Sequence, residues 1–358
     1  MMNKPALLIL MVLSTGMAAA APAFSVAKPI WPEGRSEEKN LFVGFRAAFE
    51  RPEQTPVYLR TTASTLCRVF VNGAFVGHGP VRGPHGYYRV DKWDVTPHLQ
   101  DGTNVVAFEV AGYNVNSYYL LDQPAFLLAE VAAGDTILAA TGHADAPFEA
   151  TILEERVQKV QRYSFQRPFI EVYRLAPDHD AWRTAPEAAF EPVPCAVADA
   201  KKLLPRRVPY TTFEVMPAQR WVASGTVEQG VEVERLWKDR ALTNIGPELK
   251  GYPEDALACV ISTEMQRVHT ATREEKGAAI HEDTVLALTK NDFHIVDLGR
   301  NLSGFPKVTV DCETPVRLAI TFDEVLRDGD VDWKRLGCTN VITYELAPGA
   351  YTLEAFEP

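Results

Sequence analysis

The sequence is poor in cysteine and lacks the cysteine spacing of a metal site. Its 358 residues contain five cysteines, none of them in a C-x-x-C pair: Cys67, Cys195, Cys259, Cys312 and Cys338. An odd and sparse set of this kind indicates neither a zinc site nor a disulfide framework. Two of the five, Cys67 and Cys259, lie in apolar runs and are expected to be buried thiols. The sequence does not decide whether Cys312 and Cys338 form a disulfide.

A phosphate-binding loop is also missing. Neither Gly-Lys-Ser nor Gly-Lys-Thr occurs, which excludes a P-loop. The glycine-rich stretch of residues 71–91, VNGAFVGHGPVRGPHGYYRVD, has Pro80 and Pro84 where a dinucleotide-binding loop would open a helix. Asn72-Gly73 is instead a strong signal for a hairpin turn. The glycines are therefore predicted to form tight turns at the rim of a β-sandwich.

The sequence has no excess of positive charge. Lysine and arginine number 36 against 47 aspartate and glutamate residues, a formal net charge of −11. Nucleic acids and anionic membranes both select basic surfaces, so neither is expected as a partner. No long apolar run follows the N-terminus, and no membrane span is predicted. This balance suits a protein that handles neutral ligands.

The first residues have the layout of a secretory signal peptide. Lys4 gives a positive start, residues 6–13 form an apolar core, and the alanines of 18–21 supply a cleavage site. The core is too short to span a bilayer as a helix. Residues 1–21 are therefore predicted to be a signal peptide, and the mature protein is predicted to be secreted or periplasmic.

Most of the remaining sequence has the pattern of β-strands. Runs such as 66–71, 104–110 and 316–322 alternate or are continuously apolar, and turn-forming residues separate them. Long amphipathic helices are missing, and the mostly polar segment 265–276 is the one candidate for a helix. The predicted fold is all-β, with two β-sandwich, jelly-roll-like domains joined by a proline-rich segment.

The domain boundaries follow from composition. Four prolines between residues 186 and 205 favour an extended crossing segment. We expect an N-terminal sandwich over residues 28–187, a proline-rich linker over 188–212 and a second sandwich over 213–358. The last residues resemble a strand rather than a polar tail, so a truncated product is expected.

Several ordered motifs resemble the N-terminal part of secreted α-L-rhamnosidases of glycoside hydrolase family 78. In the first half of the sequence they are Val71-Asn72-Gly73, Val76-Gly77, Tyr88, Asp91, Asp94-Val95-Thr96, Leu99 and Gly102-Thr103-Asn104. In the second half they are the stretches 297–305, 321–326, 328–329 and 356–358. Each motif alone is weak, but together they follow the family's order over most of the mature chain.

The resemblance implies that the catalytic domain of the family is missing from this sequence. In the family, an inverting (α/α)6 barrel with two acidic residues lies C-terminal to the sandwiches, and this sequence stops about where that barrel would begin. No catalytic residue is therefore assigned. The resemblance implies the non-catalytic N-terminal part of a secreted α-L-rhamnosidase-like glycoside hydrolase, inactive by itself, whose parent enzyme acts on glycans with terminal rhamnose. The alternatives are a free-standing secreted carbohydrate-binding module and a glycosidase complete within these residues.

A segment rich in tyrosine and asparagine is the candidate carbohydrate site. Sugar sites combine aromatic faces with a few fixed polar groups. The segment follows a predicted strand and supplies both kinds of side chain: Tyr113, Asn114, Asn116, Tyr118 and Tyr119. The other interpretation is a hairpin whose tyrosines pack on the edge of the sandwich.

Two groups of acidic residues are candidates for a catalytic or a metal site. Inverting hydrolysis needs two carboxyls about 6.5–9.5 Å apart, whereas the neighbours Asp323 and Glu324 would point to opposite faces of a strand. Asp328, Asp330 and Asp332 have a D-x-D-x-D spacing that could hold calcium, but the EF-hand pattern is not met. A solvated turn is expected there. No metal or cofactor is assigned, and the sequence neither indicates nor excludes a bound calcium ion.

Overall fold

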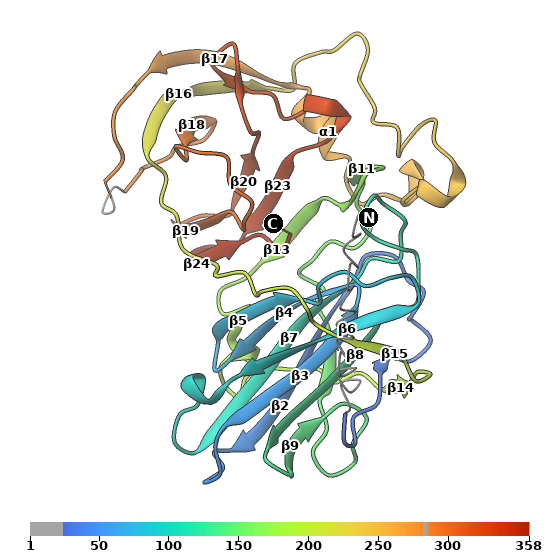
Figure 1. The fold of residues 1–358 in the computed structure, drawn as a ribbon. Coiled ribbons are helices and arrows are strands. Elements are labelled where there is room, and N and C mark those ends of the chain that lie inside the picture. The colour runs from blue at the N-terminus through green and yellow to red at the C-terminus, as the bar shows by residue number, and fades with distance from the viewer. Residues whose placement is uncertain (1–23, 282–284, 358) are drawn as a thin grey trace, which may run out of the picture.

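The computed structural model describes residues 24–281 and 285–357. The predicted signal peptide, residues 1–21, lies outside them. Strands make up 43% and helices 6%, which confirms the all-β prediction. Along the described ranges, no helix has the length and apolar character needed to cross a membrane. Figure 1 shows a sandwich of two sheets in the lower half and a second β region above it.

The lower half is a sandwich of a seven-stranded and a five-stranded sheet. The larger sheet contains β1 (Ile30–Pro32), β3 (Val57–Ser64), β6 (Tyr87–Asp94), β8 (Phe126–Ala133), β9 (Thr136–Ala140), β14 (Cys195–Val197) and β15 (Lys202–Pro205). Its order is β14-β1-β8-β3-β6-β15, with β9 beside β8. The smaller sheet contains β2 (Leu41–Glu50), β4 (Leu66–Val71), β5 (Ala74–Gly79), β7 (Thr103–Gly112) and β10 (Glu149–Ile152). Its order is β10-β2-β7-β4-β5.

Strand β4 shows that both faces of the five-stranded sheet are buried. Cys67, Val69 and Val71 belong to the core between the two sheets. The alternate residues Arg68 and Phe70 point the other way, because side chains alternate along a strand. Arg68 is nevertheless only 2% exposed, since the second β region covers this outer face. The sheet is therefore the middle layer of the molecule.

The glycine-rich stretch forms a hairpin, as predicted. Asn72 and Gly73 join β4 to β5 with left-handed φ angles of 49° and 78°. Gly77 lies so close to Trp93 that a Cβ atom there would come within 2.9 Å of the indole ring. The absence of a side chain at this position thus lets the hairpin lie against the tryptophan.

Residues 188–212, the predicted linker, cross the sandwich and add one edge strand at each end of the seven-stranded sheet. β14 pairs antiparallel with β1, and β15 pairs in parallel with β6. Pro194 and Pro205 suit an edge, because proline cannot donate a hydrogen bond to a neighbouring strand. Arg206 forms a 2.9 Å ion pair with the buried Asp91, which fixes the segment on the sheet.

The second β region is built from short sheets. Its strands are β11 (Arg162–Ser164), β12 (Arg167–Phe169), β13 (Glu171–Leu175), β16 (Arg220–Gln229), β17 (Val268–Glu275), β18 (Asp292–Asp297), β19 (Lys307–Cys312), β20 (Val316–Thr321), β21 (Leu326–Arg327), β22 (Asp330–Val331), β23 (Val341–Leu346) and β24 (Gly349–Glu354). They pair as β11-β12, β13-β23-β20, β17-β16-β18, β19-β24 and β21-β22. The helical turns of the chain are η1 (Thr96–His98), η2 (Ala181–Arg183), η3 (Pro247–Leu249), η4 (Glu254–Ala256), α1 (Ile261–Met265) and η5 (Arg335–Gly337).

The prediction of a helix over residues 265–276 is wrong. The helix α1 ends at Met265, and the strand β17 begins at Val268 and pairs with β16 over its full length. The segment Val268–Glu275 carries β-branched residues at alternate positions, which favours a strand on a pleated surface. Its polar character reflects its exposed position rather than a solvated helix.

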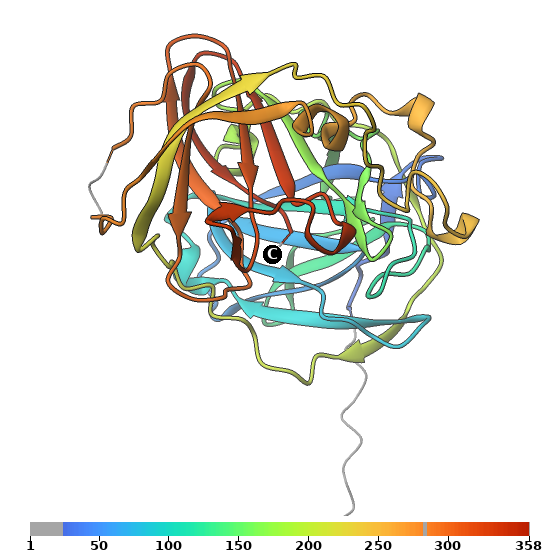
Figure 2. The same cartoon turned by 90° about the horizontal axis from the view of Figure 1, so that it is seen from above.

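Strand β13 joins the second region although it precedes residues 188–212. It pairs in parallel with β23, so that Glu171–Leu175 lies beside Ile342–Leu346. The rings of Tyr173 and Tyr344 stack across this pair with centroids 4.7 Å apart. Polypeptide from both halves of the sequence thus builds one sheet, and Figure 2 shows green and red strands together in the upper layer.

Candidate functional site

A wide cleft lies between the sandwich and the second β region. Its walls include parts of the segments 80–89 and 117–123 of the sandwich and strands β18, β19 and β20 of the second region. The cavity volume is about 4570 Å³, whereas an ordinary small-molecule site measures about 300–1,000 Å³. A single sugar would therefore occupy only part of the cleft, which also has room for packed polypeptide.

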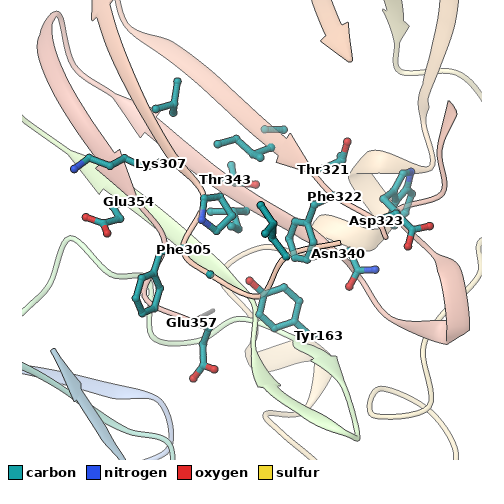
Figure 3. Close-up of a pocket in the computed structure, with 18 of the residues that line it drawn as sticks. Tyr163, Phe305, Lys307, Thr321, Phe322, Asp323, Asn340, Thr343, Glu354 and Glu357 are labelled. Carbon is teal, nitrogen blue, oxygen red and sulfur yellow. The ribbon is translucent and has the colours of Figure 1, made fainter. Parts of the chain in front are cut away.

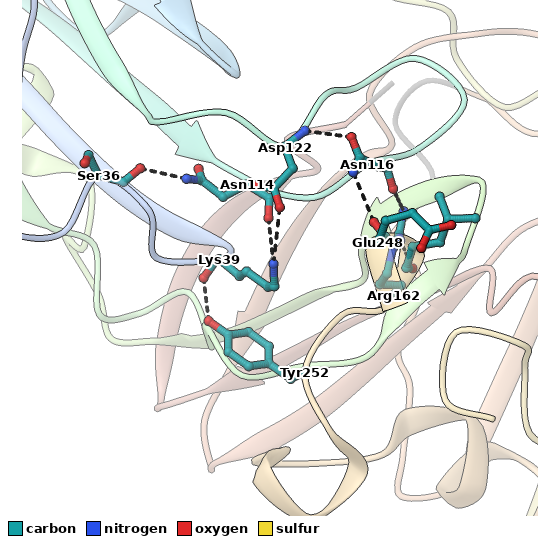
Figure 4. Close-up of polar contacts among 9 residues, drawn as sticks. Ser36, Lys39, Asn114, Asn116, Asp122, Arg162, Glu248 and Tyr252 are labelled. Atoms are coloured by element: carbon teal, nitrogen blue, oxygen red, sulfur yellow. Dashed lines mark hydrogen bonds and ion pairs between the residues drawn. The ribbon is translucent and has the colours of Figure 1, made fainter. Parts of the chain in front are cut away.

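Two residues of the predicted carbohydrate site, Tyr113 and Asn114, are buried at 1% exposure each. Asn114 has a left-handed φ of 45°. Its side-chain amide donates to the Ser36 carbonyl at 2.7 Å, as Figure 4 shows. Lys39 in turn donates to the Asn114 carbonyl at 3.1 Å. These contacts hold the segment on the sandwich and leave both side chains almost no surface for a ligand.

Asn116 ties the same segment to the second β region (Figure 4). Its side-chain amide donates to the Glu248 carbonyl at 3.1 Å, and its side-chain oxygen accepts from the Asp122 backbone N–H at 3.0 Å. The Arg162 guanidinium donates to the Asn116 carbonyl at 2.8 Å. Asn116 therefore positions the loop on which the tyrosines lie.

Tyr118 and Tyr119 reach the cleft. Tyr118 is 70% exposed, and its hydroxyl accepts a 3.0 Å hydrogen bond from the Gln166 side-chain amide. The Phe165 ring meets it edge-on with centroids 5.8 Å apart. Arg82 lies 6.0 Å from the centroid of the half-buried Tyr119 ring. The structure thus fixes an exposed aromatic face at the rim of the cleft, a surface suited to the apolar side of a sugar ring.

Two titratable groups in the cleft wall, Glu357 and His78, carried no role in the sequence analysis. The Tyr119 hydroxyl donates to Glu357 Oε2 at 3.3 Å, whereas Glu357 Oε1 and His78 Nε2 have no partner within the described residues. Burial raises the pKa of the Glu357 carboxyl to about 7 and lowers the pKa of His78 to about 4. Figure 3 shows Glu357 among the residues that line the cleft. The motif at 356–358 includes Glu357, but it does not reveal the burial of this carboxyl, because that burial depends on strands far apart in the sequence.

The Glu357 carboxyl makes the stability of the fold pH-dependent. Its ordinary pKa is 4.5, so between that pH and about 7 only the folded chain keeps this proton. The free energy of unfolding is therefore expected to fall as pH rises through this window, by up to about 3 kcal/mol from this group. Urea unfolding at about pH 5 and about pH 7.5 measures the fall, and Glu357→Gln removes this part of it. A variant with the wild-type pH profile would contradict the assignment.

The expectation that Asp323 and Glu324 point to opposite faces of a strand is wrong. Strand β20 ends at Thr321, and both carboxylates lie in the loop that follows. Both form ion pairs with the Arg335 guanidinium, Glu324 at 3.0 Å. Leaving the strand removes the alternation that would have separated the two side chains.

The D-x-D-x-D run is the turn of the hairpin between β21 and β22. Asp328 and Gly329 have left-handed φ angles of 53° and 82°, and Asp332 forms a 3.4 Å ion pair with Arg327. Within 24–281 and 285–357, no three His, Cys, Asp or Glu side chains gather where they could share a metal ion. All five cysteines are free thiols, so Cys312 and Cys338 do not pair.

Comparison with known proteins finds similarity of structure. No family model and no curated protein sequence matches the chain. The structure matches a GH78 family rhamnosidase of Bacillus sp. GL1 with a TM-score of 0.66 and 17% identity, over 92% of this chain and 52% of that one. It matches the α-L-rhamnosidase of Aspergillus terreus with a TM-score of 0.53 and 15% identity, over 93% of this chain and 32% of that one. The chain thus spans about half the length of one enzyme and a third of the other, and it has the fold of their N-terminal portion.

Proposed function

We propose that this chain is the non-catalytic β part of a secreted glycoside hydrolase of the α-L-rhamnosidase type, whose substrate is a glycan with terminal rhamnose. The observation that carries the proposal is the match of 92% of this chain to about half of the Bacillus rhamnosidase. The ordered motifs of the sequence, which resemble the N-terminal part of family 78 α-L-rhamnosidases, support it from the sequence.

The buried carboxylates of the sandwich have structural partners, which supports a non-catalytic part. Glu109 forms a 2.7 Å ion pair with Arg183, and Asp91 forms its pair with Arg206. An inverting glycosidase instead needs two carboxyls that face one substrate. The cleft is far larger than a sugar, and its size suits the packing of further polypeptide against the two β regions.

Sequencing the coding DNA across codon 358 tests the proposal. The expected result is a reading frame that continues into a helix-rich region with paired acidic residues. A stop codon directly after Pro358 would contradict the proposal and would favour the second candidate function.

The second candidate is a free-standing carbohydrate-binding module, favoured by the exposed ring of Tyr118 at the cleft rim. Here Tyr118→Ala is expected to weaken the binding of rhamnosyl glycans at least about threefold, the usual contribution of one aromatic contact. Isothermal titration calorimetry measures the affinity. Tyr210→Ala is the control, because Tyr210 is 42% exposed on another surface. Equal affinities of the Tyr118 variant and wild type would contradict glycan contact at this loop.

A further inference from the structure

Strand β20 forms one edge of its sheet. It pairs with β23 on one side and, within the described residues, with no strand on the other. The Phe322 backbone N–H donates to the Asn340 carbonyl at 3.2 Å, and the hydrogen bonds of an antiparallel pair recur at every second residue. The even-numbered residues of β20 therefore bond to β23, whereas the backbone groups of Arg317, Ala319 and Thr321 point away from it.

The apolar core beneath this sheet becomes more exposed toward β20. On β23, Ile342 and Tyr344 are 1% exposed. Their neighbours on β20, Ile320 and Leu318, pack against the same core but are only partly buried, and Val316 is 37% exposed. One more strand beside β20 would cover these apolar side chains, and burial of apolar surface stabilises a fold roughly in proportion to its area.

The edge of β20 has none of the local features that usually block strand pairing. Exposed edges are commonly protected by proline, lysine or a bulge. The sequence of β20, VRLAIT, contains neither proline nor lysine, and its pairing with β23 keeps one continuous register. The strand has one charged side chain, Arg317, and its guanidinium forms an ion pair with Glu264 of α1. Strand β20 therefore presents a regular edge that another strand can extend.

The unpaired edge opens into the cleft. All six residues of β20 line the cleft, and Arg317 and Ala319, whose backbone groups point outward, are exposed. Most of the exposed large apolar side chains in the described ranges line the same cleft, among them Leu298, Val325 and Leu326. Main-chain hydrogen bonds at a sheet edge, together with apolar contacts for alternate side chains, are the mode by which proteins bind an extended segment.

The position of β20 decides which kind of segment fits. The segment 80–89 of the sandwich and the strand β18 form other walls of the cleft, so β20 is recessed. A second folded copy has its own β20 recessed in the same way, and the two edges cannot meet. Glu357, the last residue that the structure describes, lines this cleft as well. Polypeptide that follows residue 358 in a longer product would therefore start in the cleft.

We propose that the polypeptide following this chain in the complete gene product adds a strand to the outer edge of β20 and covers the open side of the apolar core. This inference rests on the proposed function, in which the product continues beyond residue 358. It goes further by assigning the continuing polypeptide a place in the second β region.

Hydrogen exchange resolved to single amides, measured on this chain and on the complete product of its gene, tests the added strand. The amides of Arg317, Ala319 and Thr321 are expected to exchange at least about tenfold more slowly in the complete product, because each then donates to the new strand. The amides of Leu318 and Ile320 are the matched control on the same strand. They donate to β23 and are expected to be protected in both samples.

Ala319→Pro gives a second measurement, because it removes the central outward N–H and no donor to β23. It is expected to lower the Tm of the complete product more than the Tm of this chain. Ile320→Pro is its control, since it removes a donor to β23 and is expected to lower both Tm values. Equal effects of Ala319→Pro on the two proteins would contradict the added strand.

The outcomes separate this inference from the proposed function. Equally fast exchange of the outward amides in both samples would overturn the added strand, and the proposed function would stand if the complete product hydrolyses rhamnosides. Slow exchange in a complete product that is inert toward rhamnosides would support the added strand and contradict the proposed function. A stop codon directly after Pro358 would overturn both.

Discussion

Replacing Glu171 by alanine is expected to lower the free energy of unfolding by about 3–5 kcal/mol, the usual effect of breaking a buried ion pair. The Glu171 side chain is 3% exposed and lies 3.7 Å from the Arg156 guanidinium. Its two oxygens also accept the backbone N–H groups of Phe356 and Glu357, at 2.7 and 3.0 Å. The variant therefore leaves a buried cation without its partner and two buried amides without an acceptor.

Urea unfolding followed by circular dichroism measures this effect, with Glu345→Ala as the control. Glu345 lies in the same sheet and forms a 2.9 Å ion pair with Arg174, but the two side chains are 41% and 56% exposed. Exposed pairs of this kind contribute about 0–1 kcal/mol. Equal effects of the two substitutions would show that Glu171 does not hold the segment 354–357 in place.

Phe356→Ala is expected to cost about 3–5 kcal/mol, the range for truncating a fully buried phenylalanine. The ring is 0% exposed. Its centroid lies 5.0 Å from that of Phe42 and 6.0 Å from that of His78, both on the sandwich. The Arg156 guanidinium lies 4.9 Å from the same ring. Removing the ring opens a cavity at the junction of the two β regions.

Tyr118→Ala is the matched control for this second substitution, because it also truncates an aromatic side chain but at 70% exposure. Substitutions at exposed positions usually change stability by less than about 0.5 kcal/mol. Urea unfolding of both variants gives the comparison. If Phe356→Ala were no more destabilising than Tyr118→Ala, residues near the end of β24 would not join the two regions.

Charged and aromatic groups together explain why the second region stays on the sandwich. Arg68 forms a 3.0 Å ion pair with Glu354 and donates to the Ala355 carbonyl at 3.3 Å. Its guanidinium also lies 5.0 Å from the Phe75 ring and 5.2 Å from the Phe305 ring. One arginine of β4 thus contacts two parts of the second region at once, which aligns the walls of the cleft.

The fold class could be predicted from the sequence because strand patterns are local. The hairpin at Asn72 and Gly73 and the all-β class both depend on neighbouring residues. The burial of both faces of the five-stranded sheet could not be predicted in the same way. Arg68 and Glu109 alternate with core residues and so have the pattern of solvent-facing positions, yet they are 2% and 3% exposed. Their partners lie far away in sequence, because Arg68 pairs with Glu354 and Glu109 pairs with Arg183.

The site could be predicted only as a region. The composition of residues 111–119 indicated aromatic and amide side chains near a ligand, and Tyr118 does present its ring at the cleft. Composition could not separate Tyr118 from Tyr113, which is buried, because that difference arises from packing across the sandwich.

The most direct measurement is an assay of p-nitrophenyl α-L-rhamnoside hydrolysis with the purified chain and with the complete product of its gene, side by side. We expect no turnover by the chain alone and clear turnover by the complete product. Hydrolysis by the chain alone, abolished by a single carboxylate substitution, would contradict the proposed function, as would a complete product that is inert toward rhamnosides.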